Sequence, residues 1–187
     1  VKFALVQSDV YQAFINQGNA GDANAASIIR PLRVIMPLYN EEIYFIVRAD
    51  SPMNQVHDIR DSRINVGAMR SGTAMSATTL YRLMFERSIV DDKLSFHNNE
   101  DALVKLTGDR SIDVAVVVAG QPAKLLADMK PEARALIKLL KFDAEHPTSK
   151  ATLKTYFQST VRASSYPSLL TEDVPGIAVK AYLVTYD

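Results

Sequence analysis

The sequence predicts an α/β fold with mainly parallel sheets. Strand-like apolar segments alternate with helix-like segments along most of the 187 residues, and this alternation is typical of parallel sheets. One run, VAVVV at 114–118, is continuous and β-branched, as expected of a strand that is buried on both faces. Another apolar run, at 64–66, leads into a loop bounded by two glycines and then into a helical pattern.

The first quarter of the chain contains three predicted strands, at 3–6, 32–38 and 43–49. A short helix at 10–14 is expected to follow the first strand. Residues 17–26 are rich in Gly, Asn and Ala, which indicates a loop.

The rest of the chain continues the alternation until the last forty or so residues, where turns at Tyr166-Pro167 and 173–175 replace it. One predicted helix follows the glycine loop, a second begins at Asn98 or Asn99 and ends at Gly108, and a third begins at Pro122. The further predicted strands are 64–66, 94–96, 114–118, 137–142 and 177–185.

The composition excludes several classes of function. Lys plus Arg equals Asp plus Glu, at 21 each, so the chain has no overall positive charge for nucleic acid. It has no cysteine, which excludes disulfides and thiolate catalysis. No apolar run approaches the ~20 residues that span a bilayer, and no signal peptide opens the chain. Because the first strand starts almost at once, we expect that an N-terminal portion is missing.

The loop between the glycines is the strongest candidate for a binding site. Residues 67–73 spell G-x-x-x-x-G-T, which lacks the lysine of a nucleotide-binding phosphate loop. A helix that starts at Ser71, Gly72 and Thr73 offers free amide N–H groups and a positive dipole end, which favour a carboxylate or a phosphate. The alternative is a helix cap that binds nothing.

Two further segments follow apolar strands, where ligands of parallel sheets bind. Gln7, Ser8 and Asp9 offer an amide, a hydroxyl and a carboxylate, or they simply cap the next helix. Ala119 and Gly120 are small enough to let a ligand approach the backbone, or they form a plain turn. Beside the glycine loop, Arg70 is either a clamp for a carboxylate or an exposed arginine.

Catalytic patterns are weak by comparison. The three histidines are scattered and lack the i, i+4 spacing of metal ligands, so they are interpreted as surface residues and no metal is expected. Adjacent acids such as Glu41-Glu42 are interpreted as solvated loop charge, since neighbours in sequence point different ways. No G-x-S-x-G motif is present. These patterns favour a binding protein over an enzyme, with no cofactor.

Four motifs taken in order resemble the TAXI family of solute receptors of TRAP transporters. Each motif is weak alone, but together they extend over essentially the whole chain. They are V-Q-S-D at 6–9, V-G-x-x-x-S-G-T at 66–73, D-x-A-x-x-x-A-G at 113–120, and Y-P with E-D-V-P at 166–167 and 172–175.

The resemblance implies a type II periplasmic binding protein, in which two α/β lobes close on a small ligand. On this mapping the first lobe comprises 1–42 and 155–187 and is incomplete, and the second comprises 43–154 with the crossover segments. The ligand would be an anionic or zwitterionic solute such as glutamate, passed to membrane transporter subunits from the periplasm or another extracytoplasmic space. The residues that the resemblance assigns to the ligand site are Gln7, Ser8, Ser71, Gly72, Thr73, Val118, Ala119, Gly120 and Tyr166.

The resemblance has departures, and other functions stay open. The family's signal sequence and its opening glycine-rich, tyrosine-bearing loop are missing, and Ser168 stands where glycine is common. An effector-binding domain of a transcriptional regulator or sensor would use the same fold, and an upstream helix-turn-helix segment would identify it. An enzyme related to thiamine-pyrimidine synthesis would need a nucleophile or base at the cleft, and the sequence offers none.

Overall fold

The computed structural model describes residues 2–187 and contains one mixed eight-stranded sheet with helices on both faces. Val1, the first residue of the expected first lobe, lies outside the described residues. The strands are β1 (Phe3–Gln7), β2 (Leu32–Arg48), β3 (Ile64–Asn65), β4 (Leu94–Ser95), β5 (Val114–Ala119), β6 (Ile137–Leu139), β7 (Phe157–Val161) and β8 (Val174–Tyr186). The α-helices are α1 (Ser8–Asn19), α2 (Ala23–Ile29), α3 (Gly72–Phe85), α4 (Asn99–Thr107), α5 (Lys124–Ala127), α6 (Pro131–Arg134) and α7 (Ser149–Thr152).

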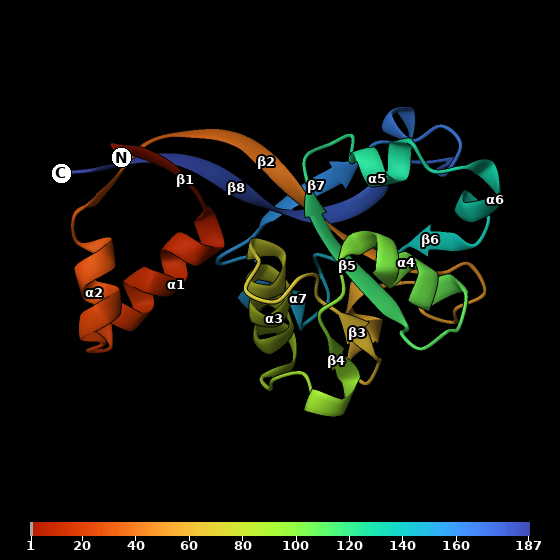
Figure 1. Ribbon diagram of the computed structural model, residues 1–187, viewed down its shortest axis with the longest axis horizontal. Helices are drawn as coiled ribbons and strands as arrows, with labels where there is room; N and C mark the ends of the chain where they lie inside the picture. Colours follow the sequence, from red (N-terminus) through yellow and green to blue (C-terminus); the bar gives the residue numbers. More distant parts are fainter. Residues whose placement is uncertain (1) are drawn as a thin grey trace.

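Two long strands, β2 and β8, run side by side through the whole molecule and join two lobes of unequal size (Figure 1). The small lobe, residues 2–40 and 181–187, contains β1, α1, α2 and the outer halves of β2 and β8. All the other helices and strands belong to the large lobe (Figure 1). The lobes therefore share one continuous pair of strands.

The expectation of mainly parallel sheets is wrong, because the sheet is mixed. Every pair that includes β2 or β8 is antiparallel. Only β3 pairs in parallel, with β4 and β5. Helices α3 and α4 supply the long crossovers that parallel neighbours need. Strands β2 and β8 run in opposite directions instead, since one carries the chain from the small lobe to the large lobe and the other brings it back.

Strand β2 also replaces the two strands that were predicted at 32–38 and 43–49. It is a single strand of 17 residues, paired with β8 along most of its length. Pro37 indicated a strand end, but the register of the β2–β8 pair shifts on either side of it. Such irregularities accommodate a proline that cannot donate to the ladder, so the strand continues through it.

Of the remaining predicted helices, strands and loops, some are confirmed and others are wrong. The helix after the glycine loop, the helix that ends at Gly108 and the strand at 114–118 are confirmed as α3, α4 and β5. The predicted loop at 17–26 is wrong, because α1 runs to Asn19 and Asp22 caps α2 by accepting hydrogen bonds from two backbone amides. Strand β7 has no counterpart in the prediction, and the helix expected from Pro122 is only the single turn α5.

The core of the large lobe lies on both faces of β2 and β5. Ile43, Phe45 and Val47 pack into a cluster with α3, whereas Tyr44 and Ile46 pack into a cluster with α4 and α5 on the opposite face. The alternation follows from the two-residue period of a strand. It gives three layers, with the sheet buried between helices, and holds α3 rigidly against the sheet.

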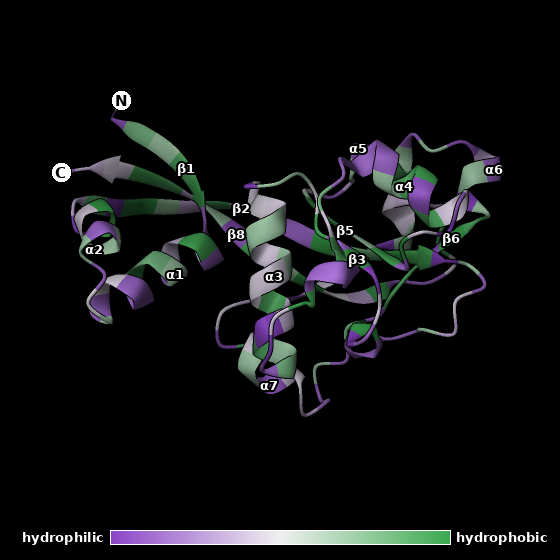
Figure 2. Cartoon of the chain, turned by 60° about the horizontal axis from the view of Figure 1, so that its bottom comes forward, coloured by the Kyte–Doolittle hydropathy of each residue, from purple (hydrophilic) through white to green (hydrophobic). Residues whose placement is uncertain are grey.

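The small lobe is covered on one face only. Helices α1 and α2 lie below its strands (Figure 1), and β1 and the outer half of β2 carry exposed apolar side chains. Phe3 and Leu5 are 61% and 60% exposed, and the hydrophobic colouring of β1 and the outer part of β2 is plain in Figure 2. Among residues 2–187, the structure contains no helix with the length and hydrophobicity needed to cross a membrane.

Candidate functional site

The N-terminus of α3 carries backbone amides that find no hydrogen-bond acceptor in the described part of the chain. Ser71 caps the helix, and its hydroxyl oxygen accepts a hydrogen bond of 3.0 Å from the Ala74 amide. Within residues 2–187, the amides of Gly72 and Thr73 donate to no acceptor. Free amides and a positive dipole end at the start of a 14-residue helix suit a bound anion.

The loop before α3 is shaped by two residues with positive φ. Gly67 has φ 85°, and a Cβ there would lie 3.1 Å from the Thr73 methyl carbon, so only glycine lets the loop fold back over the helix start. Arg70 has φ 64° and an exposed side chain. A non-glycine residue in this region is uncommon, and it marks a constrained turn beside the free amides.

Gln7 brings the small lobe to this turn. Its Nε2 donates a hydrogen bond of 2.7 Å to Glu41 Oε2, while its Oε1 is buried and has no hydrogen-bond partner. A Cβ on Gly72 would lie only 2.6 Å from that Oε1. A neutral carbonyl oxygen therefore lies against the start of α3, from the opposite lobe.

Ser8 and Asp9 are both buried, and each accepts hydrogen bonds from other parts of the protein. The Ser8 hydroxyl oxygen accepts a hydrogen bond of 3.0 Å from the Lys180 amide. Asp9 Oδ2 accepts hydrogen bonds from Ser76 Oγ at 2.5 Å and from the Tyr156 hydroxyl at 2.9 Å. Burial, followed by the charge of Asp9, raises the pKa of Tyr156, which keeps this hydroxyl a donor. Asp9 thus ties α1 of the small lobe to the large lobe.

The predicted residues at the end of β5 lie at the sheet edge. Val118 pairs with Ile43, and Ala119 pairs with Glu42 on β2. Gly120 is exposed, and a Cβ added to it would meet no atom within 4 Å. Open space therefore adjoins the backbone there, as a ligand approaching it would need.

Tyr166 lies in the core of the large lobe. It is 2% exposed, and its hydroxyl oxygen lies 2.7 Å from that of Tyr44. The same oxygen accepts a hydrogen bond of 2.6 Å from the Ala123 amide. Both contacts are internal, so the Tyr166 hydroxyl lies among core residues. Gln7, by contrast, lies against the Ser71–Thr73 turn.

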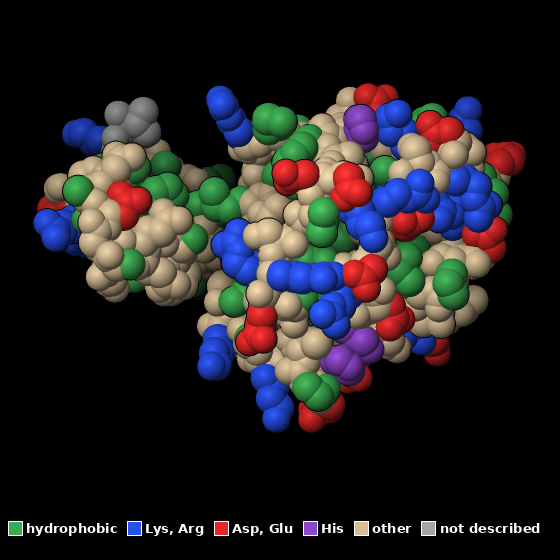
Figure 3. Space-filling view, turned by 90° about the horizontal axis from the view of Figure 1, so that it is seen from below, with side chains coloured by type: hydrophobic (Ala, Val, Ile, Leu, Met, Phe, Trp, Pro, Cys, Tyr) green, Lys and Arg blue, Asp and Glu red, His purple; other side chains and the backbone are tan. Residues whose placement is uncertain are grey.

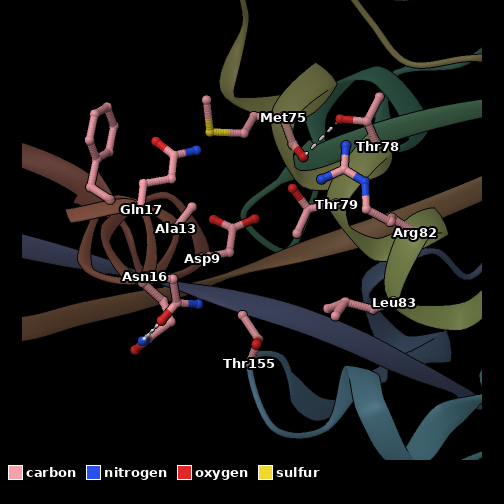
Figure 4. Close-up of a pocket in the computed structure, with 12 residues that line it drawn as sticks. Asp9, Ala13, Asn16, Gln17, Met75, Thr78, Thr79, Arg82, Leu83 and Thr155 are labelled. Carbon is pink, nitrogen blue, oxygen red and sulfur yellow. Dashed lines mark hydrogen bonds between the residues drawn. The ribbon is translucent and has the colours of Figure 1, made fainter. Parts of the chain in front are cut away.

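Of the hollows in the described part of the chain, two lie close to the predicted segments, and the ten predicted site residues line neither of them. One, of about 400 Å³, lies between α1 and α3, where the lobes meet. Figure 3 shows the small lobe standing apart from the large lobe on this face, and Figure 4 shows the cavity itself. The other, of about 530 Å³, lies near the end of β5 and is lined by polar groups that include Asn40, Glu42 and Arg162.

The adjacent acids Glu41 and Glu42 are not solvated loop charge, contrary to expectation. Both lie on β2 and, as neighbours on a strand, face opposite sides of the sheet. Glu41 accepts from Gln7, and Glu42, 5% exposed, accepts from the Ser159 hydroxyl. Burial raises the pKa of Glu42, and the bond from Ser159 acts in the opposite direction. The apolar run that begins at Ile43 is the feature of the sequence that could have revealed the burial of Glu42.

The histidines are also less scattered than expected. His57 and His146 stack with ring centroids 3.6 Å apart. Their sequence separation hid this contact. In the described part of the chain, no group of three or more His, Asp and Glu side chains is placed to hold a metal ion.

No curated protein matches the sequence. Several solved structures are similar in fold. One is the arginine-, lysine-, histidine-binding protein ArtJ from Geobacillus stearothermophilus, with 8% identity, a TM-score of 0.49, and coverage of 86% of this chain and 52% of that chain. Another is a TctC solute binding protein from Polaromonas, with 18% identity, a TM-score of 0.48, and coverage of 99% and 57%.

A third similar structure is the CcmR regulatory domain from Synechocystis PCC6803 in complex with 2-PG, with 14% identity, a TM-score of 0.46, and coverage of 94% and 69%. The chain spans a little more than half the length of the first two of these proteins. The NMT1-like family matches the sequence over residues 1–187, and the chain therefore belongs to the NMT1-like family.

Proposed function

We propose that the chain binds a small carboxylate or amino acid, glutamate-like in its chemistry, between its two lobes. In this proposal it acts as a TAXI-type receptor in the periplasm or another extracytoplasmic space and delivers the solute to a TRAP-type membrane transporter. The TAXI resemblance of the four motifs supports the transporter partner. Membership of the NMT1-like family is the established, coarser assignment.

The observation that carries the proposal is the contact between Gln7 and the start of α3. Gln7 Oε1 has no hydrogen-bond partner among residues 2–187, and a Cβ on Gly72 would lie 2.6 Å from it, at the helix start that carries the free amides of Gly72 and Thr73. A ligand carboxylate is a stronger acceptor than a carboxamide oxygen and gains more from the helix dipole. It would displace the flexible Gln7 side chain and accept from the amides and from the Thr73 hydroxyl.

Strands β2 and β8, which join the two lobes, would act as the hinge. A ligand that contacts Gln7 and Ser8 in one lobe and Ser71 to Thr73 in the other binds best when the lobes are close together. Binding then shifts the population towards closure about β2 and β8. Arg70, Val118, Ala119, Gly120 and Tyr166 stay in the proposed set as lining residues. The proposed division, 1–42 with 155–187 against 43–154, assigns residues 155–180 to the first lobe, although they lie in the large lobe of this structure.

Calorimetry with L-glutamate tests this function. The expected result is saturable binding to the chain, weakened ~10-fold or more by Thr73→Val, because a hydrogen bond to a charged ligand contributes about 1.5–3 kcal/mol. Thr171→Val, at an exposed position outside the site, serves as the matched control. Equal affinity of Thr73→Val and the parent chain would remove the turn from the site.

An effector-binding domain of a transcriptional regulator is the second candidate, since the same interlobe site would serve it. The full-length sequence of the protein would discriminate the two. An export signal supports the receptor, whereas a helix-turn-helix segment supports the regulator.

A further inference from the structure

We propose that His57 and His146 form a proton-sensitive latch, which holds the turn before α7 in place while His146 is neutral and releases it when His146 takes up a proton. The two imidazole rings stack with their centroids 3.6 Å apart and their planes 10° apart. His57 lies on the 3₁₀-helix Val56–Ile59, whereas His146 lies in the loop between β6 and α7. The stack therefore joins two separate segments of the large lobe, and it does not depend on the ligand proposed above.

His146 holds its own loop through a ring nitrogen that acts as an acceptor. Its Nδ1 accepts a hydrogen bond of 3.3 Å from the Thr148 backbone amide and lies 2.8 Å from the Thr148 hydroxyl oxygen. A ring nitrogen that accepts from an amide carries no proton, so the arrangement requires a neutral ring with its proton on Nε2. Protonation would turn Nδ1 into a donor that faces the amide N–H, and the hydrogen bond from Thr148 would be lost.

The two rings differ in their counter-charge. His57 Nε2 lies 3.8 Å from Asp58 Oδ1, and within residues 2–187 no carboxylate oxygen lies within 4.0 Å of a His146 ring nitrogen. Asp58 Oδ2 also accepts from the amides of Asn54 and Gln55, which fixes the carboxylate in place. Asp58 therefore compensates a proton on His57, whereas a second proton on His146 would bring two positively charged rings into contact.

Three further charged residues lie near His146 in the chain. Asp143 and Glu145 precede it, and Lys150 follows it on α7. Asp143 Oδ1 accepts from the Glu145 amide, and the side chains of Glu145 and Lys150 are exposed. Asp58 is the charged group that contacts the stack in the described part of the chain. Burial opposes the effect, but the two amide hydrogen bonds and the charge of the histidines keep the pKa of Asp58 below its ordinary value, so it stays ionised.

The turn that His146 holds leads to the contact between the lobes. The His146 carbonyl accepts a hydrogen bond of 2.9 Å from the Ser149 amide at the start of α7. Just beyond α7, the Tyr156 amide donates to the Thr152 carbonyl at 2.8 Å, and the Tyr156 hydroxyl donates to Asp9 of the small lobe. Release of the turn before α7 should therefore loosen this contact between the lobes as the pH falls.

Amide NMR between about pH 7.5 and about pH 5 tests the latch, since the ordinary pKa of an imidazole is ~6.5. The Thr148 amide proton should move upfield as pH falls, because it loses its acceptor. Protection of the Tyr156 amide from hydrogen exchange, corrected for the intrinsic effect of pH, should drop ~10-fold. His57→Gln should raise the midpoint of the Thr148 transition by ~1 pH unit, because the second positive ring is gone. His97→Gln, which removes the histidine outside the stack, should leave that midpoint unchanged.

His146→Gln provides a second test. The glutamine side chain can still accept from the Thr148 amide but takes up no proton, so Tyr156 protection should no longer depend on pH. Thermal unfolding at neutral pH shows whether this variant folds; if it does not, the midpoint in His57→Gln decides alone. A Thr148 amide resonance that stays unmoved, a midpoint unchanged in His57→Gln, or an equal loss of Tyr156 protection in a folded His146→Gln would each overturn the proposal.

Discussion

Gln7 Oε1 and the Cα of Gly72 lie so close that a Cβ on residue 72 would stand 2.6 Å from that oxygen, although the two residues belong to different lobes. The contact places an acceptor of the small lobe at the positive end of a helix in the large lobe. The same oxygen has no hydrogen-bond partner, so the contact is suited to exchange with a ligand oxygen.

Gly72→Ala should therefore affect binding more than folding. The new methyl group displaces the end of the flexible Gln7 side chain and disturbs its bond to Glu41, at a cost of about 1 kcal/mol in the free energy of unfolding. It also occupies the space between the helix start and Gln7, where the proposed ligand carboxylate would lie, so L-glutamate affinity should fall ~10-fold or more, in line with a lost charge-assisted hydrogen bond. Gly120→Ala, where a Cβ meets nothing, is the control for stability. Wild-type affinity in Gly72→Ala would contradict this account.

Tyr156→Phe tests the buried junction between the lobes. The Tyr156 hydroxyl donates to Asp9 Oδ2, and a hydrogen bond to a charged group contributes about 1.5–3 kcal/mol. The free energy of unfolding in urea should fall by this amount. Tyr186→Phe, at an exposed position, should change it little. If Tyr156→Phe lowers the free energy of unfolding no more than the control does, the hydrogen bond from Tyr156 to Asp9 does not stabilise the fold.

Glu42→Gln tests the effect of burial on a carboxyl group. Burial raises the folded-state pKa of Glu42 above its ordinary 4.5, so its contribution to stability is present below that value and is lost as pH rises through the raised pKa. The variant removes the buried charge, and its melting temperature relative to the parent chain should be higher at neutral pH than at a pH below 4.5. Glu41→Gln is the matched control on the other face of β2. A pH-independent difference would contradict the assignment.

Asp113→Asn tests the ionic contact that fixes the start of β5. Hydrogen bonds from Arg63, opposed by partial burial and aided by Arg48, hold the pKa of the Asp113 carboxyl well below its ordinary value. The stability that it contributes is present above the unfolded-state pKa and is lost as pH falls through the folded-state value. At neutral pH the variant should lose about 1.5–3 kcal/mol in chemical denaturation. Asp128→Asn, at an exposed position, should lose almost nothing, and equal losses would show that the pairing is without consequence.

The features that the sequence predicted are those set by neighbouring residues. Ser71 as the cap of α3, Gly108 at the end of α4 and the buried run of β5 all depend on local patterns, and each is confirmed. The direction of the strands was wrong, because the alternation of strands and helices does not reveal that β2 and β8 cross between lobes in opposite directions.

The contacts around the site were beyond local patterns. Asp9 meets Ser76 across 67 positions and Tyr156 across 147 positions, so no short motif joins them. Glu42 was wrongly interpreted as solvated loop charge, although its place directly before the apolar run at 43–47 could have indicated its burial.

The central claim is that the amides of Gly72 and Thr73 bind the ligand carboxylate, and amide NMR during an L-glutamate titration tests it most directly. Both amide protons should show saturable downfield shifts, because a carboxylate replaces a site without an acceptor. Saturable binding that leaves both resonances unmoved would contradict it.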